Sequence, residues 1–269
     1  MTRDGGGAGA VDPQQLWLAP TGPRRGRRPA HSREAITAAA VALADAEGLE
    51  AVTMRKVASQ VGVSVMSLYS YAPDKGTLLE LMVDQVSGEL TTGGAPESGA
   101  VPAPPGAPPQ PPGASPRPPG GPGAAYAPTG DWRADLKAIG HLQRALMLRH
   151  PWLPAALSTR RTPGPHTLAF VEHALAVLRP TGLDGAARLE IFAQLTAFVA
   201  AHVGHELART AAAGAPDRAA AEARYLAAVA ADGHHPELAE ALAAPGRSLT
   251  PEATFTRFLN RLTDGLDTD

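Results

Sequence analysis

Hydrophobic residues recur every three or four positions along several stretches of this chain, and this spacing predicts amphipathic helices. The first stretch follows Ser32, a favourable helix N-cap, and ends at Gly48. Its buried face is predicted to comprise Ile36, Ala40 and Leu43. Further stretches with the same period begin near Lys75 and Asp131 or cover residues 165–178, 185–210 and 251–266. The pattern therefore predicts an all-α fold.

Residues 53–71 are predicted to form two short helices separated by a turn at Gly62. Val57 and Ala58 of the first helix are spaced to pack against Leu68 of the second. The side chains left to point outward are polar, aromatic or cationic, namely Arg55, Ser64, Met66, Ser67, Tyr69 and Tyr71. Such side chains bond phosphate oxygens and base edges, while the apolar ones fix the angle between the helices. The segment is predicted to be a helix-turn-helix that reads DNA.

Composition divides the chain into four segments. Residues 1–30 are rich in Gly, Pro and Arg without periodicity, which predicts a flexible basic tail, and residues 31–90 hold the helix-turn-helix with a connector helix. Residues 91–130 contain 13 prolines and 9 glycines, which predicts a disordered linker or insertion. Residues 131–269 are predicted to form a helical C-terminal domain.

The basic tail contains the run Arg24-Arg25-Gly26-Arg27-Arg28. Arg27 and Arg28 are candidates to enter the minor groove or to contact phosphates, as the arm of a homeodomain does. A solvated run of charge is an equally good interpretation.

Composition and charge restrict the class of protein further. The 269 residues are 44% hydrophobic, enough for a sizeable core, and the absence of cysteine excludes disulfides and thiol catalysis. The net charge is −2, yet residues 24–75 carry eight Lys or Arg against five acids, so that this part is +3 and the remainder −5. A basic N-terminal part on an acidic body would orient the molecule on DNA. Without a secretory segment or an apolar run of about 20 residues, we expect a cytoplasmic, nucleoid-associated protein with no membrane partner.

Several short motifs between residues 31 and 90 resemble the DNA-binding domain of the tetracycline-repressor (TetR) family of bacterial regulators. The matching motifs are Glu47-Gly48-Leu49, Val52-Thr53, the helix-turn-helix, Leu68-Tyr69-Ser70-Tyr71, Asp74-Lys75 and Leu78-Leu79. The resemblance implies a homodimer with two recognition helices about 34 Å apart, and hence a near-palindromic operator in double-stranded DNA. Carried over position by position, the DNA contacts are Thr53, Arg55, Ser64, Val65, Met66, Ser67, Tyr69, Tyr71 and Lys75.

These contacts are expected to differ in role. Thr53, Arg55 and Lys75 would hold phosphates, whereas residues 65–67 would touch thymine methyls and base edges. Tyr69 would bond a phosphate through its hydroxyl. For both tyrosines of the motif, packing of the ring inside the domain is the alternative.

The proline-rich segment is the main departure from the family, in which the connector helix runs directly into the C-terminal core. Its 40 residues are long enough to loop out from two helices that remain packed together. We therefore expect coupling between the two domains to survive the insertion.

The resemblance also implies a C-terminal domain that binds a small-molecule effector and dimerises through the helices at 185–210 and 251–266. Within residues 165–178, Leu168, Val171, Leu175 and Leu178 are expected to face the core, and the opposite, mixed face to line a pocket. Such a mixture favours an apolar or aromatic effector. The candidate pocket residues are His141, Trp152, His166, Phe170, His173, Phe198 and His202.

Two alternatives belong to other classes of protein. Eight of the nine histidines follow residue 140, and His202 with His205 raises the possibility of a metal-dependent enzyme. A third ligand, a nucleophile motif and a Gly-rich phosphate loop are not found, so we predict no catalytic residue, metal site or cofactor. A nucleoid-type DNA-binding protein without an effector is the second alternative, and the modest local charge fits it poorly.

Overall fold

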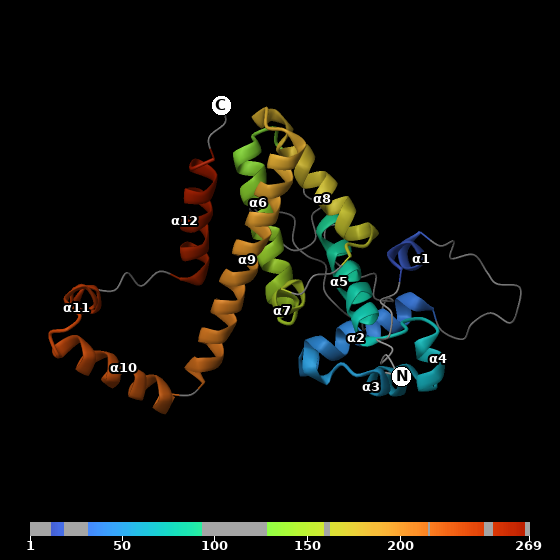
Figure 1. Cartoon of the computed structure of the whole chain (residues 1–269), viewed down its shortest axis with the longest axis horizontal. Helices are drawn as coiled ribbons and strands as arrows, with labels where there is room; N and C mark the ends of the chain where they lie inside the picture. The colour runs from blue at the N-terminus through green and yellow to red at the C-terminus, as the bar shows by residue number, and fades with distance from the viewer. Residues whose placement is uncertain are drawn as a thin grey trace, which may run out of the picture.

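The computed structural model describes residues 12–18, 32–92, 128–158, 162–214, 216–244 and 250–266. All secondary structure in these ranges is helical, which confirms the predicted all-α class. An N-terminal group of helices and a larger C-terminal group lie on either side of α5 (Figure 1). The bounds are α1 Pro13–Trp17, α2 Arg33–Glu47, η1 Leu49–Ala51, α3 Met54–Val61, α4 Val65–Tyr69, α5 Lys75–Thr92, α6 Trp132–Arg149, α7 Leu153–Leu157, α8 Pro165–Val177, η2 Arg179–Thr181, α9 Gly185–Ala213, α10 Pro216–Ala231, α11 Pro236–Ala243 and α12 Pro251–Asp264.

Polar caps and glycines set the limits of the N-terminal helices. The hydroxyl of Ser32 accepts a hydrogen bond from the backbone N–H of Ala35 at 3.1 Å and so begins α2. Gly48 ends α2 with φ 83°, and Gly62 separates α3 from α4 with φ 79°. A side chain is disfavoured at both backbone angles, so the two glycines enforce the short helices and the sharp turn that the sequence predicts.

We call α2, α3 and α4 the head. These helices lie together at the lower right of Figure 1, where α2 packs on α3 and α3 on α4. The residues predicted to form the head core are buried, namely Ile36, Ala40, Leu43, Val57, Ala58 and Leu68. This core holds α4 from one side and leaves its other side to solvent.

Helix α5 connects the head to the remaining helices. Its predicted apolar face is buried and consists of Leu78, Leu81, Met82 and Val86. It contacts α2 of the head and also α6, α7 and α8. Residues 93–127, most of the proline-rich segment, lie outside the described residues, yet α5 and α6 on either side of it touch. This contact is what the loop-out interpretation requires.

We call α6 to α12 the body. Its centre is formed by α6, which contacts both α9 and α12. Phe255 and Leu259 of α12 are completely buried. A Cβ atom at Gly140 of α6 would lie 3.0 Å from the Leu259 side chain, so the glycine allows α12 to approach closely. Among the described helices, none combines the length and the apolarity that a bilayer crossing needs.

The orientation of α8 differs from the sequence prediction. Phe170, Ala174 and Val177 are buried, whereas Leu168, expected in the core, is 52% exposed. Apolar residues occur all around this helix, so their spacing does not distinguish its two faces. Packing against α5 and α9 turns the Phe170 side inward. The face predicted to line a pocket is therefore largely the core face.

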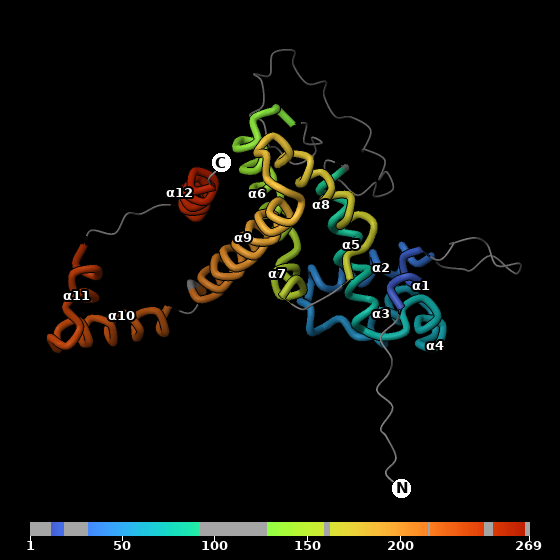
Figure 2. Tube along the Cα trace, turned by 45° about the horizontal axis from the view of Figure 1, so that its top comes forward, coloured from blue at the N-terminus to red at the C-terminus, as the bar shows by residue number. Residues whose placement is uncertain are grey.

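Four α-helices, namely α1, α7, α10 and α11, lie where none was predicted. Within the expected tail, Asp12 caps the short helix α1, whose Leu16 is buried. Helices α10 and α11 pack on each other and extend away from the rest of the body in both views (Figures 1 and 2). Both helices consist mainly of exposed residues, many of them alanines, and contain no buried residue.

Candidate nucleic-acid interface and ligand cavities

Helix α4 presents one face to the head core and the other to solvent. Leu68 is completely buried, whereas Met66 is 79% and Tyr69 41% exposed. Ser64 caps the helix, since its hydroxyl accepts the N–H of Ser67 at 3.0 Å and lies 2.9 Å from the Ser67 hydroxyl. An exposed thioether beside two hydroxyls suits a major groove, where thymine methyls and base-edge hydrogen-bonding groups alternate.

The residues expected to hold phosphates flank α4. The Thr53 hydroxyl caps α3 by accepting the N–H of Lys56 at 3.2 Å. Arg55 lies in the first turn of α3 and Lys75 begins α5, and both are exposed. Because the N-terminal end of a helix carries a partial positive charge, cations at these two ends reinforce an attraction for phosphate.

Other predicted DNA contacts lie closer to the core or outside the described residues. Val65 and Tyr71 are half-buried and pack against the hydrophobic core. Ring packing, given above as the alternative for both tyrosines, therefore describes Tyr71, whereas Tyr69 is exposed. Arg27 and Arg28 lie outside the described residues.

Three of the seven predicted pocket residues come together in the body. His141 of α6 and both Phe198 and His202 of α9 surround Phe255 of α12, with ring centroids 5.1, 5.8 and 5.2 Å from its own. Phe258 lies next to them, with its ring 6.3 Å from Phe198. We call these five residues the aromatic cluster. Phe255 and Phe258 were not among the predicted pocket residues, although their place on an apolar helix was recognised.

A cavity of about 490 Å³ opens beside the aromatic cluster, between α9 and α12. Its volume is in the range of small-molecule sites, about 300–1,000 Å³. Burial lowers the pKa of the His202 imidazole, and the charges of Arg144 and His205 reinforce this effect against the opposing charge of Glu206. The cavity therefore offers a neutral imidazole as a hydrogen-bonding group. The lining residues are His202, His205, Glu206, Arg209, Thr210, Pro251, Thr254 and Phe258.

Close to this cavity, Arg144 of α6 binds carboxylates from α9 and α12. Its Nη2 lies 2.8 Å from Oε1 of Glu206 and its Nε 3.2 Å from Oε2, while Nη1 donates to Glu252. His141 lies 3.1 Å from the same Glu252. The guanidinium is buried, so these carboxylates compensate its charge. Arg144 was not predicted from the sequence, because its carboxylate partners are 62 and 108 residues away in the chain.

A second cavity, of about 780 Å³, lies between α7, α8 and α9. Leu157, Val171 and Phe192 form its apolar walls. Small residues of α9 complete it, namely Ala193, Ala197, Ala200, Ala201 and Gly204. It offers few hydrogen-bonding groups compared with the α9–α12 cavity.

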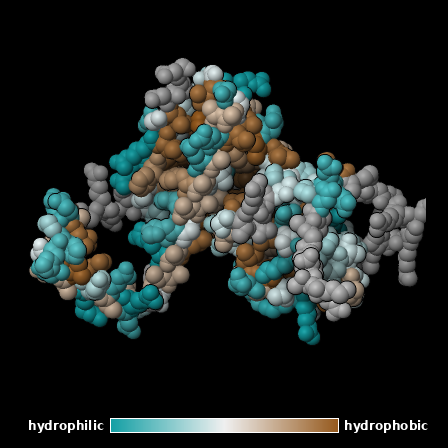
Figure 3. All heavy atoms as spheres, viewed as in Figure 1, coloured by the Kyte–Doolittle hydropathy of each residue, from teal (hydrophilic) through white to brown (hydrophobic). Residues whose placement is uncertain are grey.

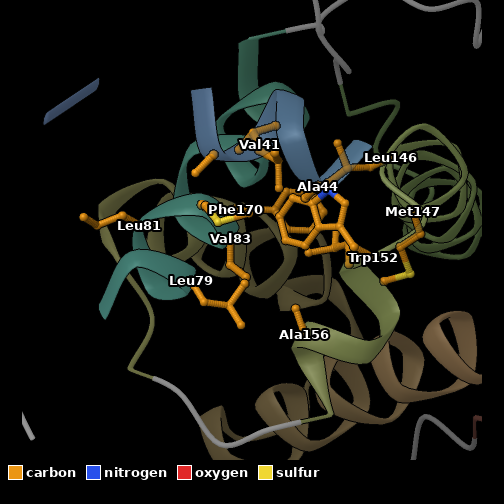
Figure 4. Close-up of a cluster of buried hydrophobic side chains, with 14 of the residues drawn as sticks. Val41, Ala44, Leu79, Leu81, Val83, Leu146, Met147, Trp152, Ala156 and Phe170 are labelled. Carbon is orange, nitrogen blue, oxygen red and sulfur yellow. The ribbon is translucent and has the colours of Figure 1, made fainter. Parts of the chain in front are cut away.

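The remaining four predicted pocket residues line neither cavity. Trp152 and Phe170 lie in the core that is shared by head and body (Figure 4). His166 begins α8, where its Nδ1 lies 2.9 Å from Asp84 of α5, and His173 is half-buried on the same helix. These four lie apart from the aromatic cluster: Trp152 precedes α7, and the mixed face of α8 packs against α5 and against Phe192 of α9, not against α12.

Trp152 belongs to a polar contact that joins α2, α5, α6 and α7. Its indole N–H donates to Oδ1 of Asp45 at 2.7 Å. The ring of His150 lies between two carboxylates, with Nδ1 2.8 Å from Asp45 Oδ1 and Nε2 3.1 Å from Glu89 Oε1. Arg149 also pairs with Glu89. We call these five residues the junction. Sequence reasoning did not connect them, because the partners are far apart in the chain.

The charges of the junction stabilise one another. Burial by itself lowers the pKa of His150, but hydrogen bonds and charges from Glu89 and Asp45 outweigh it and raise this pKa. Burial by itself raises the pKa of Glu89, yet the interactions with His150 and Arg149 lower it. Both directions favour an imidazolium between two carboxylates.

The histidines do not assemble a metal site in the part of the chain that the structure describes. No three His, Asp or Glu side chains converge there as metal coordination requires. His202 and His205 instead line the α9–α12 cavity.

Two family models match this chain. The model described as bacterial regulatory proteins of the tetR family matches residues 36–82, which include most of the head. The model described as the tetracyclin repressor-like C-terminal domain matches residues 125–269, more than half of the chain.

Individual relatives are similar over large parts of the chain. The HTH-type transcriptional repressor DrrR1 of Streptomyces coeruleorubidus is 35% identical over 170 residues, which cover 62% of this chain and 51% of that protein. An HTH-type transcriptional regulator of Saccharopolyspora erythraea is 29% identical over 194 residues, covering 72% of this chain and 68% of its own length. The chain thus spans about half the length of the first relative and about two thirds of the second.

Solved structures share the fold. The structure of ActR from Streptomyces coelicolor in complex with actinorhodin matches with a TM-score of 0.63 at 24% identity, covering 87% of this chain and 96% of ActR.

Proposed function

This chain belongs to the TetR family of bacterial transcriptional regulators, which are not enzymes, and from that premise we propose that it is a repressor released from DNA by a small molecule. The observation that carries the proposal is the exposed face of α4, where Met66 and Tyr69 stand free of the head core. A regulator of this kind works at the nucleoid, in the cytoplasm.

We assign the DNA contacts by exposure and position. Arg55, Lys75 and Tyr69 bind phosphates and so position the head on the duplex. Thr53 stabilises the start of α3 as its N-cap. Val65, Met66 and Ser67 at the start of α4 contact base edges, and Ser64 holds that turn. Tyr71 keeps α4 at its angle by packing its ring against the core. Arg27 and Arg28 supplement the phosphate contacts.

The operator is a near-palindrome that is bound by a homodimer. The small residues of α9 that line the apolar cavity leave room for a second helix to pack closely, and Phe258 of α12 is 42% exposed. Figure 3 shows apolar residues exposed along the course of α9 and above it. A two-fold axis through α9 and α12 pairs two heads, and recognition helices about 34 Å apart fit successive turns of the major groove.

The effector is an aromatic or largely apolar molecule that occupies the α9–α12 cavity. Phe258 of the aromatic cluster provides a ring surface, while the neutral His202 and the Arg209 side chain provide hydrogen bonds for polar substituents. ActR, a structural neighbour, has been solved with actinorhodin bound. Effector and operator binding are coupled reciprocally, typically by about 1–3 kcal/mol.

The proposal is tested by incubating the dimer with a genomic fragment library and an excess of nonspecific DNA at physiological salt. We expect a small set of fragments that share an inverted repeat to be retained, and their retention to fall when a bound aromatic compound is present. Retention of no competitor-resistant fragment would contradict the repressor assignment. Retention of all fragments equally would favour an effector-less nucleoid protein.

A further inference from the structure

In the junction, the side chain of His150, at the end of α6 in the body, contacts one carboxylate of the head and one of the connector helix α5. Asp45 is in the last turn of α2, Glu89 near the end of α5, and His150 is the C-cap of α6. His150 is 5% exposed, so its contacts with the two carboxylates are shielded from water.

The number of protons on His150 determines how many of these contacts exist. An imidazolium donates from both nitrogens, which matches one carboxylate on each side. A neutral imidazole has a single N–H, so one carboxylate then faces a ring nitrogen that is an acceptor. Two acceptors at hydrogen-bond distance repel, so that contact is lost when the ring is neutral.

The neighbouring groups make Asp45 the carboxylate that loses its cationic partner on deprotonation, whichever ring nitrogen keeps the remaining proton. Glu89 still pairs with Arg149, whereas in the described part of the chain Asp45 forms no ion pair other than that with His150 and keeps the neutral indole N–H of Trp152. Asp45 is also the residue of the junction that lies in the head. Losing the imidazolium therefore weakens the link between head and body more than the link between connector and body.

We propose that protonated His150 is a positioning residue that holds the head at a fixed angle to the body, and that its deprotonation frees the head and weakens operator binding. This inference rests on the proposed function, because it concerns the same DNA-binding head. A dimer needs both heads at the spacing of the operator, so a head that is docked for part of the time lowers the apparent affinity in proportion.

The sign of the pH dependence follows from the raised pKa of His150. Its stabilisation is complete below the ordinary value of 6.5 and is lost as pH rises through the raised pKa of the folded protein. Glu89 has a lowered pKa, so its contribution is present above its ordinary value of 4.5 and is lost only as pH falls through the lowered pKa. The junction is therefore complete in mildly acidic solution and opens on the alkaline side.

The experiment measures affinity for the duplex that the wild-type protein selects from a random-sequence pool, between about pH 6 and pH 9 at constant ionic strength. We expect wild-type affinity to fall about threefold or more over this range, as for a dimer in which both heads are docked together about a third of the time. His150→Gln should bind with the weaker, alkaline affinity at every pH. Equal pH profiles for the wild type and this variant would overturn the proposal.

Two further variants separate charge from mere packing. Asp45→Asn keeps an acceptor for Trp152 but removes a charge that favours the imidazolium, so the midpoint of the pH profile should move to lower pH. An unchanged midpoint contradicts the proposal. His166→Gln is the matched control, since His166 also pairs with a carboxylate of α5, Asp84, but is not bonded to Asp45 or Glu89. It should keep the wild-type profile.

A measurement without DNA keeps this inference separable from the repressor assignment. The chain has no cysteine, so Ser59→Cys in the head and Ala186→Cys in the body provide a unique pair for spin labels. In dimers diluted with unlabelled chain, the distance distribution should be narrow at mildly acidic pH and broad at alkaline pH, and broad at both for His150→Gln. If the protein selects no duplex, the proposed function is contradicted. The distance between the two spin labels still tests whether His150 holds the head in place. Identical distributions in both proteins at both pH values would rule that role out.

Discussion

The indole N–H of Trp152 donates to Oδ1 of Asp45 over 2.7 Å, which ties the start of α7 to the last turn of α2. A second polar contact, between Arg144 of α6 and Glu206 of α9, lies beside the α9–α12 cavity. Arg144 and His150 are six residues apart, about 9 Å along α6. A molecule that moves Glu206 therefore acts on the helix whose end holds the head.

Arg55→Ala should weaken DNA binding by a similar factor for all sequences, because we assign its exposed guanidinium to a phosphate and not to a base edge. Its loss should reduce the slope of log affinity against log salt by about one. Titrations at several salt concentrations measure this slope. Arg218→Ala, which makes the same charge change on α10, should leave the slope unchanged. A loss confined to the selected operator would assign Arg55 to base recognition instead.

Gly62→Ala should destabilise the head by about 1 kcal/mol, because an L side chain is strained at φ 79°. A Cβ atom there meets no atom within 4 Å, so strain and not a clash is the cause. Urea unfolding should show a lower midpoint with an unchanged slope. Gly185→Ala, in the first turn of α9 without a positive φ, is the comparison and should not lose stability.

Arg144→Met should destabilise the body by about 3–5 kcal/mol, because it leaves the carboxylate of Glu206 buried without its partner. The Arg144 and Glu206 side chains are only 10% and 16% exposed. Adding Glu206→Gln removes the orphaned charge and should recover part of the loss in thermal or urea unfolding. Additive losses in the double variant would mean that the two residues are not coupled.

Acidification should lower the free energy of unfolding, because His202 binds a proton less readily in the folded than in the unfolded chain. Its folded-state pKa is lowered below 6.5, mainly by burial, so the unfolded chain takes up the proton first. The stabilisation from the neutral ring is present above 6.5 and is lost as pH falls through the lowered pKa. His202→Phe should reduce the loss of unfolding free energy on acidification, whereas His234→Gln, at an exposed site, should not. A wild-type acid response in His202→Phe would remove His202 from this explanation.

Phe258→Asp should shift the protein from dimer to monomer, because it places a charge on the face of α12 that we assign to the interface. Light scattering during size-exclusion chromatography reports the mass directly. Tyr225→Asp changes a more exposed aromatic residue of α10, 67% exposed, and should leave the mass unchanged. An unaltered mass for Phe258→Asp would move the interface elsewhere.

The features that the sequence predicts correctly are those decided by near neighbours. Ser32 and Gly48 limit α2 through bonds and backbone angles within a few residues, and the burial of Leu68 follows from its spacing to Val57 and Ala58. These signals act within a few residues, and each is compatible with a single local structure.

The features that sequence reasoning missed depend on distant partners. His150 meets Asp45 across 105 residues, and no periodicity links the two. Phe170 was predicted to line a pocket because it shares a face with two histidines, but the helix carries apolar residues on all sides, and only contact with α5 and α9 decides which side turns inward. Trp152 was predicted to be a pocket residue for its aromatic ring, whereas its indole N–H serves the junction.

Because the junction draws its acids from α2 and α5 and its base from the end of α6, the two halves of this regulator are not freely interchangeable. A biosensor can be made by replacing the DNA-binding half of this chain with that of another family member. This replacement would remove Asp45 and Glu89. His150 would then meet whatever side chains the donor supplies. Successful grafts should be those whose donor brings acids to both places.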